Sequence, residues 1–496
     1  MRTYFVSLAA LAAAVIAFSM WRAQRAEPRA QHADEKAGTY ASYASSVQPI
    51  FDRRCVPCHA CYDSPCQLTL QSFEGFDRGA NRDLVYYPER ALTAKPTRMF
   101  QDAQTTARWQ SDFGFFPVAT REQPNTLARS MLWRYLSQRA DYERGKDFDV
   151  DATTTCPRDM TELEAELHEK PERGMPFGFP ALTSNERNVL GEWLRNGAGG
   201  YSLDHDESEH GALAEQVAKW EAFFDQSDPK RPLVSAYLFE HLFYAHLQFE
   251  AAPGSWFRLV RSRTPPGTPI DEIATRRPYD DPGTEHFYYR LRRIRETLVL
   301  KTHVPYLLSD MKLDRLTALF YRSTWTPPPS AAPFDPKVAA NPFIAFAPIP
   351  ARARYQFMLD DARYHVQVFI HGPVCRGQAA LDVIEEQFLI FFLAPDNDPS
   401  IDDPAYLASV ADELSLPAEH GGTIAALSPG FDAREIRYLG QQSARVRARG
   451  RADIWNGDGT NADAVLTVFR HYDNAFVVRG ALAGMPKTAW VVDYPI

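Results

Sequence analysis

The stretch Cys55-Val56-Pro57-Cys58-His59 is the feature of this sequence that most constrains its fold. Two cysteines separated by two residues and followed at once by a histidine form the attachment pattern of haem c. In such a site the two thiols hold the haem covalently, and the adjacent histidine binds the iron as proximal ligand. We therefore predict one covalent haem c, held by Cys55, Cys58 and His59.

Two further cysteines, Cys61 and Cys66, follow closely and leave different chemistries open. A ferredoxin-type iron–sulfur run has three residues before its last cysteine and a proline after it, whereas here four residues intervene and Gln67 follows. Structural zinc or a purely disulfide-bonded loop would also use cysteines at this density. The N-terminus has an export pattern, and an oxidising compartment outside the cytoplasm favours covalent haem. Cys61 and Cys66 would then form a small disulfide loop, and Cys156 and Cys375 would be either free or bonded to each other.

The sixth ligand of the haem iron is a separate question, and Met175 is the best candidate. It lies in the turn-rich loop Arg173–Pro180, just before a helix expected from Thr183 to Gly197, as in the C-terminal half of a cytochrome c domain. His168 is the second candidate, and Met175 could instead be an ordinary core methionine. If neither residue binds, the iron is open to substrate.

The N-terminus has the pattern of an export segment. A basic start, an apolar run from Tyr4 to about Trp21 and a following group of arginines predict a signal peptide or an N-terminal anchor in residues 1–30. The remaining chain should then lie outside the cytoplasm. Its net charge of -9 and its 45% of hydrophobic residues are ordinary for a globular protein and argue against a nucleic-acid partner. The absence of a phosphate-cradling glycine loop argues against a nucleotide partner.

The length of 496 residues is too great for one compact core. The sequence predicts a mainly α N-terminal cytochrome c-like domain with a long insertion at residues 38–201, followed by a mixed α+β domain at residues 202–496 that handles lipid. A proline-rich crossing segment is expected near residues 326–350, because proline removes backbone donors and disfavours helix. Residues 43–51 should form a short helix that leads into the cysteines. No internal repeat is evident.

Four shorter patterns predict local structure. Thr183 and Glu186 form a capping box at the start of the helix that follows Met175. The segment Leu233–Phe249 is typical of an aromatic-rich helix, and residues 464–479 are typical of a β-hairpin. The alternating arginines between Arg445 and Arg451 predict one face of an exposed strand.

With these motifs in place, the sequence resembles the fatty acid cis-trans isomerases of Gram-negative bacteria over much of its length. The residues that carry the resemblance are, in chain order, Val47–Phe51, Cys55–His59, Cys61–Cys66, Arg78–Ala80, Tyr237–Phe243, Phe257–Gly267, Ala274–Pro282, Lys301–Tyr306, Gly372–Gln378 and Ile454–Gly459. Members of that family continue past the segment that matches Asp493–Pro495, so we expect a member shortened at its C-terminus.

The resemblance implies a periplasmic enzyme that converts cis double bonds of unsaturated fatty acyl chains to trans without moving the bond. It implies free fatty acids or phospholipid acyl chains as substrates, contact with the membrane surface and one covalent haem c. His59 would act in catalysis through the haem iron, with Cys55, Cys58, His59 and Met175 binding the cofactor and His59 and Met175 binding its iron. The alternative, from another class, is a periplasmic, membrane-associated c-type cytochrome that carries electrons.

Histidines on the matched segments are further candidates. His241 and His246 lie on the expected helix, but their spacing of five residues keeps them off one common face. His303 and His371 each stand next to a matched motif. The alternative for all four is a hydrogen-bonded core histidine.

An arginine-rich region stands out in this acidic sequence. Its members are Arg258, Arg261, Arg263, Arg276 and Arg277. They could bind lipid phosphates at a membrane surface, or they could form structural ion pairs with the acidic residues nearby.

Overall fold

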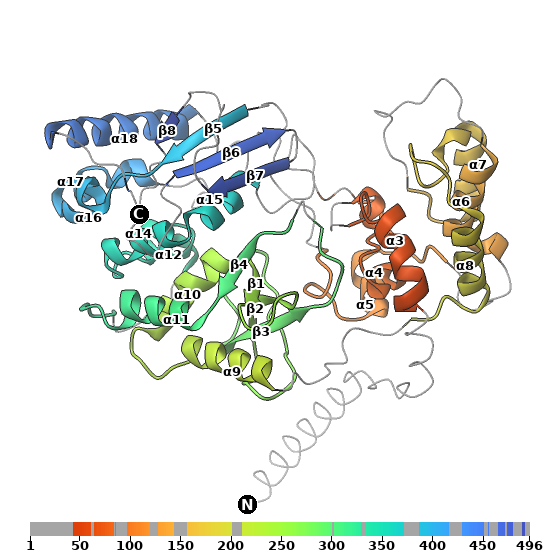
Figure 1. Cartoon of the computed structure of the whole chain (residues 1–496), viewed down its shortest axis with the longest axis horizontal. Helices are drawn as coiled ribbons and strands as arrows, with labels where there is room; N and C mark the ends of the chain where they lie inside the picture. Colours follow the sequence, from red (N-terminus) through yellow and green to blue (C-terminus); the bar gives the residue numbers. More distant parts are fainter. Residues whose placement is uncertain are drawn as a thin grey trace, which may run out of the picture.

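The part of the chain that the structure describes is mostly helical and contains two small sheets (Figure 1). The computed structural model describes residues 43–60, 64–83, 85, 97–119, 127–142, 156–200, 211–299, 302–328, 334–371, 386–415, 429–450, 455, 465–471, 474–479 and 489–491. The predicted signal peptide or anchor at residues 1–30 and the predicted boundary at residue 202 lie outside the described residues. Among the helices within them, none is long and apolar enough to cross a membrane.

The N-terminal part is helical, in agreement with the predicted fold class. Its helices are η1 (Tyr43–Val47), α3 (Gln48–Arg54), η2 (Pro65–Gln67), α4 (Phe73–Arg78), α5 (Thr106–Phe113), η3 (Leu127–Arg129), α6 (Met131–Asp141), α7 (Met160–Glu169), η4 (Pro171–Arg173) and α8 (Ser184–Arg195). The capping box of α8 is confirmed, since Thr183 Oγ1 accepts from the Glu186 N–H and the Glu186 carboxylate accepts from the Thr183 N–H. A cytochrome c fold for this part stays a prediction.

An aromatic cluster holds α3 in place. Tyr43 and Phe51, from the short helix predicted at residues 43–51, are buried against Trp193 of α8, with ring centroids 5.6 Å and 5.9 Å away. Phe76 of α4 lies 4.7 Å from the same ring. Tilted and edge-on aromatic pairs add to the burial of apolar area. The packing of α3 against α4 and α8 therefore fixes where the chain reaches Cys55.

The first sheet lies at the centre of the molecule in Figure 1. Its strands are β1 (His246–Phe249), β2 (Trp256–Ser262), β3 (Tyr288–Ile294) and β4 (Pro305–Leu308), in the order β3-β2-β1-β4. β1, β2 and β3 are antiparallel, and β4 runs parallel to β1. Phe257 and Leu259 project from one face of β2 into the largest hydrophobic core. Helices that contribute to this core include α9 (Ala212–Phe224), α10 (Arg231–Leu242), α11 (Asp310–Leu316), η5 (Thr317–Tyr321) and α14 (Ala351–Asp360).

The second sheet repeats the topology of the first. Its strands are β5 (Glu386–Phe391), β6 (Val465–His471), β7 (Asn474–Arg479) and β8 (Ala489–Val491), in the order β7-β6-β5-β8. β5, β6 and β7 are antiparallel, and β8 runs parallel to β5. The predicted hairpin at residues 464–479 is confirmed by the β6–β7 pair. The repeat is one of strand order, which the residues alone did not reveal.

The remaining helices belong to the C-terminal half. They are α12 (Pro336–Ala339), α13 (Pro342–Ala345), α15 (Ala362–His371), η6 (Pro395–Asn397), α16 (Pro399–Asp402), α17 (Pro404–Ser409), η7 (Ala411–Leu414) and α18 (Pro429–Ala448). α15 packs against β7.

The proline-rich segment near residues 326–350 contains α12 and α13 rather than a wholly extended crossing. Proline begins both helices because the first helical position needs no N–H donor.

The prediction of one helix from Leu233 to Phe249 is wrong in its last part. The helix ends at Leu242, and β1 begins at His246. The His246 N–H donates to the Val304 carbonyl at 2.9 Å, and β4 continues this parallel pairing. A strand partner far along the chain thus overrides the local helical pattern.

The predicted strand at Arg445–Arg451 is also wrong, because α18 extends through most of it. Residues four apart share a face of this helix: Tyr438 and Gln442 are both buried. On its exposed side Arg445 pairs with Asp403, and Arg449, which follows the last residue of the helix, pairs with Asp402. The arginines alternate with other residues over a short stretch, which predicted a strand. Over the longer segment that contains them, the buried residues recur with the period of a helix.

Candidate functional site

The cysteine–histidine segment begins where α3 ends. The Cys55 N–H donates to the Phe51 carbonyl at 2.8 Å, and the His59 N–H donates to the Cys55 carbonyl at 2.8 Å. This tight turn follows α3, whose buried residues are Ile50 and Phe51. Cys55 is half-buried and Cys58 is exposed, and both thiols are free. Burial raises the pKa of the Cys55 thiol to about 12, with a smaller contribution from Cys58. Two free thiols beside one histidine fit covalent attachment of a haem.

His59 is oriented by a backbone oxygen. Its Nδ1 lies 3.0 Å from the Leu68 carbonyl. Because a carbonyl can only accept, Nδ1 carries the proton, and the neutral ring presents the lone pair of Nε2. Burial lowers the pKa of His59, and the hydrogen bond to Leu68 partly opposes that shift. This is the arrangement expected of a histidine that binds a metal through Nε2, since a fixed Nδ1–H sets the tautomer.

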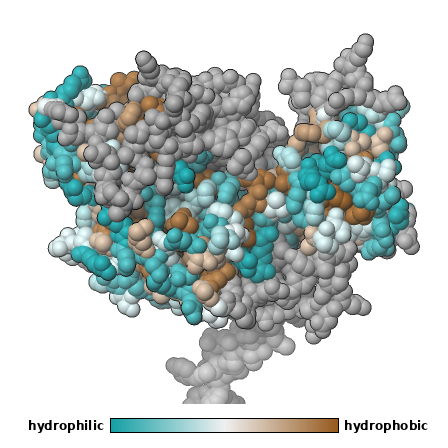
Figure 2. All heavy atoms as spheres, viewed as in Figure 1, coloured by the Kyte–Doolittle hydropathy of each residue, from teal (hydrophilic) through white to brown (hydrophobic). Residues whose placement is uncertain are grey.

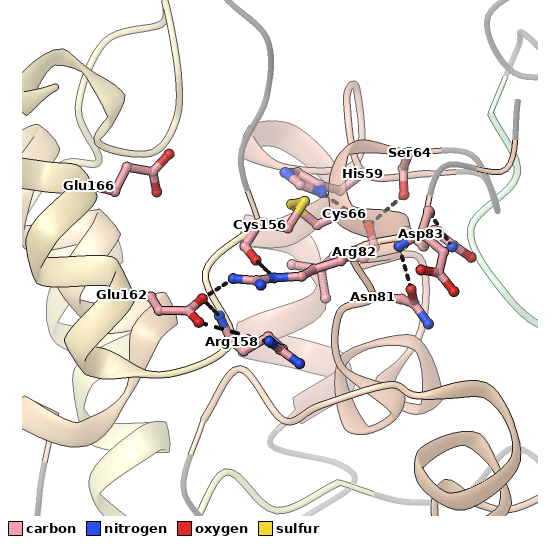
Figure 3. Close-up of a disulfide and its surroundings, with 12 residues drawn as sticks. His59, Ser64, Cys66, Asn81, Arg82, Asp83, Cys156, Arg158, Glu162 and Glu166 are labelled. Atoms are coloured by element: carbon pink, nitrogen blue, oxygen red, sulfur yellow. Dashed lines mark hydrogen bonds and ion pairs between the residues drawn. A yellow bond between two sulfur atoms is a disulfide. The ribbon is translucent and has the colours of Figure 1, made fainter. Parts of the chain in front are cut away.

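Cys66 does not bond to Cys61, contrary to the prediction. It forms a disulfide with Cys156, with the Cα atoms 5.6 Å apart (Figure 3). The pairing of Cys156 with Cys375 is therefore excluded, and Cys61 and Cys375 lie outside the described residues. The error has a physical reason: the insertion folds back onto the cysteine loop, which spacing along the chain does not reveal. A disulfide also removes Cys66 from any four-cysteine iron–sulfur cluster.

Arg82 supports the disulfide, and the sequence did not single it out. Its Nε donates to the Cys156 carbonyl at 2.7 Å, and it pairs with Glu162 of α7 (Figure 3). Arg78, which stood only as part of a matched motif, is fully buried. It donates to the carbonyls of Gln67 and Thr97. A buried arginine next to glycine is a weak signal in one sequence, so the role of Arg78 could not be recognised beforehand.

Met175 is held in the same helical part of the molecule. Its N–H donates to the Tyr135 carbonyl at 3.0 Å, and its side chain packs against the hydrophobic core that Cys55 also contacts. The preceding Gly174 leaves no room for a side chain, because a Cβ there would lie 2.4 Å from Arg139 N. His168 is exposed on α7. The role of Met175 as an iron ligand stays a prediction.

The structure brings together two histidines that the sequence kept apart. Nδ1 of His246 lies 2.8 Å from Nδ1 of His303, and their rings are stacked. One Nδ1 must donate to the other, so the pair holds at least one neutral ring. Burial, with a smaller contribution from His303, lowers the pKa of His246 to about 3. Only the parallel β1–β4 pairing makes this contact, so no local signal could have found it.

The remaining candidate histidines have different surroundings. His241 Nδ1 lies 2.8 Å from the Tyr237 carbonyl, and its ring packs against Tyr237 and Phe357 of the large core. Burial lowers its pKa to about 4, which fits a neutral, hydrogen-bonded core histidine. His371 is the last residue of α15.

The arginine-rich region forms structural ion pairs in several places. Arg258 and Arg292 share the carboxylate of Glu272, at 3.5 Å and 2.8 Å. Arg277 pairs with Asp280 at 2.8 Å. Arg263 pairs more loosely, at 3.4 Å, with Asp271. Structural ion pairing, one of the two interpretations of this region, therefore applies to Arg258, Arg263 and Arg277.

A further segment joins the first sheet to the cysteine–histidine region. The Thr297 N–H donates to the Gln71 carbonyl at 3.0 Å, and Thr297 Oγ1 donates to Asp52 at 2.9 Å. Val299 packs against the N-terminal core. The chain that leaves β3 thus returns to the helix that carries Cys55 at its end.

Comparison with known families places the chain among isomerases. It matches the family model described as fatty acid cis/trans isomerase (CTI) over residues 94–496, and the chain belongs to this family. It is thus an enzyme that acts on unsaturated fatty acyl chains by cis/trans isomerisation. The matched region begins after the segment Cys55–His59, so the match does not cover the predicted haem attachment. No curated protein and no solved structure matches the chain.

Proposed function

We propose that this isomerase works with one haem c, bound covalently by Cys55 and Cys58 and ligated through its iron by His59. The observation that carries the proposal is the hydrogen bond from His59 Nδ1 to the Leu68 carbonyl, beside two free thiols at the spacing of a haem c attachment. When bound, ferric haem would supply an electron acceptor that transiently weakens the alkene, so that rotation can occur without moving the double bond.

The residues of the chain have simpler tasks. The Leu68 carbonyl orients His59, and the ion pairs and aromatic contacts around α3 keep the attachment segment rigid. Met175 is the proposed sixth ligand. Its packing on the same core as Cys55 supports that role. The apolar run near the N-terminus supports export, and we propose that the enzyme acts in the periplasm at the membrane surface.

The test is turnover by the purified, haem-loaded protein. Incubation with a cis-monounsaturated fatty acid, followed by gas chromatography, should give the trans product with the double bond at its original position. His59→Ala should abolish this product, whereas the matched control His286→Ala, an exposed histidine away from the site, should not. Equal activity of His59→Ala and wild type would refute the haem mechanism. Product with a shifted bond would refute simple rotation.

A further inference from the structure

A cavity of about 450 Å³ lies between the cysteine–histidine region and the first sheet. This volume is within the range of roughly 300–1,000 Å³ that holds small-molecule ligands. One wall is formed by Ala60, Thr69 and Gln71, and the opposite wall by residues of α10, β2 and the segment that follows β3. Figure 2 shows apolar residues reaching the surface in the hollow between the helical part and the sheet-containing body.

The first wall includes the residue next to the candidate iron ligand and the residue next to Leu68. Ala60 follows His59, and Thr69 follows Leu68, whose carbonyl orients the His59 ring. Any molecule in the cavity therefore lies against the segment that would carry the haem. The second cavity, of about 780 Å³, touches none of these neighbours and is lined largely by charged residues.

Much of the lining is apolar. Phe243, Val260 and Val304 contribute from the sheet side, and Leu298 contributes from the segment anchored to Asp52 and Gln71 through Thr297. Val260 and Val304 are buried, while Phe243 and Leu298 are partly exposed. When a hydrocarbon covers partly exposed apolar side chains that face a cavity, apolar surface is removed from water, which favours binding.

One end of the cavity carries an excess of positive charge. Thr275 receives a hydrogen bond on its carbonyl from Arg98 and on Oγ1 from Arg261. Arg98 is neutralised by Asp102, whereas the hydrogen bonds that Arg261 donates to described residues go to neutral oxygens. Arg261 is 1% exposed, and its Nε has no hydrogen-bond partner among the described residues.

Arg276 completes this cationic end. It is exposed, lines the cavity and has no ion-pair partner within the described part of the chain. Arg258 and Arg292 share a single carboxylate nearby. Glu296 also lines the cavity and offsets part of the charge. The positive excess stands out in a protein whose net charge is -9.

We propose that this cavity binds one cis-unsaturated fatty acid as the free acid, with its carboxylate at Arg276 and Arg261. The hydrocarbon lies along Phe243, Leu298 and Val304, against the segment that carries His59. The inference rests on the proposed function, because it assigns the substrate site of that isomerase. A cavity of about 450 Å³ with a cationic end fits one chain and one acidic group better than a two-chain phospholipid.

The test measures binding to the haem-loaded full-length protein without turnover. Oleic acid, its methyl ester and phosphatidylethanolamine vesicles each compete with a fluorescent fatty acid. Leu298→Arg should weaken binding of oleic acid about tenfold or more, because it buries a charge in the acyl path. Leu307→Arg is the matched control, since Leu307 is exposed on β4 away from the cavity, and it should bind normally.

The charged end is tested separately. Arg276→Glu should weaken the binding of oleic acid about tenfold and leave the binding of the methyl ester unchanged. Arg276→Lys should retain part of the affinity for oleic acid. The control is Arg293→Glu, because Arg293 is an exposed residue of β3 that lines the second cavity. This variant should bind both ligands with unchanged affinity.

Three outcomes would overturn the proposal: normal binding by Leu298→Arg, equal loss of acid and ester in Arg276→Glu, or competition by vesicles alone. Failure of the proposed function looks different. A protein that binds oleic acid through these residues but makes no haem-dependent trans product would refute the haem mechanism and leave the binding site standing.

Discussion

Arg54 and Glu186 form a two-pronged ion pair across 132 residues of the chain, with N–O distances of 3.0 Å and 2.9 Å. Arg54 is the last residue of α3, immediately before Cys55, and Glu186 belongs to the capping box of α8. The pair therefore ties the attachment segment to the helix that follows the Met175 loop. Both proposed iron ligands depend on the elements that this contact joins.

Loss of this pair should destabilise the protein in a pH-dependent way. The hydrogen bond from Arg54 lowers the pKa of Glu186 to about 2, below its value of 4.5 in an unfolded chain. The stabilisation is thus complete above pH 4.5 and is lost as the pH falls toward 2. Glu186→Gln should cost about 2 kcal/mol at pH 7 and much less near pH 2, as measured by urea unfolding. Glu192→Gln, on the exposed side of α8, should show no such dependence.

Glu240 should produce the opposite pH dependence. Burial raises its pKa to about 8, although Arg261 opposes the shift. The folded protein then binds a proton that the unfolded chain releases, so stability falls as the pH rises from about 4.5 to 8. Glu240→Gln should melt at a higher temperature than wild type at pH 8.5, by roughly 2–4 °C for each kcal/mol gained, and at nearly the same temperature at pH 4.5. A constant difference at both pH values would contradict this assignment.

The Cys66–Cys156 disulfide closes a loop with a sequence separation of 90. Cys156→Ser should lower the free energy of unfolding of the N-terminal part by about 3–5 kcal/mol, because the unfolded chain gains conformational entropy. Cys66→Ser and the double variant should lose the same amount, since all three lack one bond. A reducing agent should lower the free energy of unfolding of the wild-type protein to that of the variants. If it does not, the disulfide does not stabilise the protein in this way.

Gly79 should tolerate no side chain. Its φ is +85°, and a Cβ would lie 2.0 Å from the Phe116 carbonyl oxygen, where Ala80 and Phe116 exchange backbone hydrogen bonds. Gly79→Ala should cost about 3 kcal/mol or more, by thermal or urea unfolding. Gly267→Ala is the matched control, because its φ is +80° but nothing lies within 4 Å of the added Cβ. It should cost only about 1 kcal/mol.

Local sequence was sufficient for the features that depend on neighbouring residues. The family was recognisable from short motifs, the helix at residues 43–51 from its apolar spacing, and the start of α8 from the Thr183–Glu186 capping box. The hairpin of β6 and β7 was also correct. Each of these depends on interactions between residues close along the chain, which one sequence displays directly.

Contacts between distant residues required the folded molecule. Folding ended α10 at Leu242 by pairing His246 with Val304, joined Cys66 to Cys156, and brought Thr297 to Asp52. It also placed Arg276 and Leu298 in one cavity with Ala60. The physical reason is that such contacts arise from folding of the whole chain, which overrides local preference where a distant strand or side chain offers the better partner.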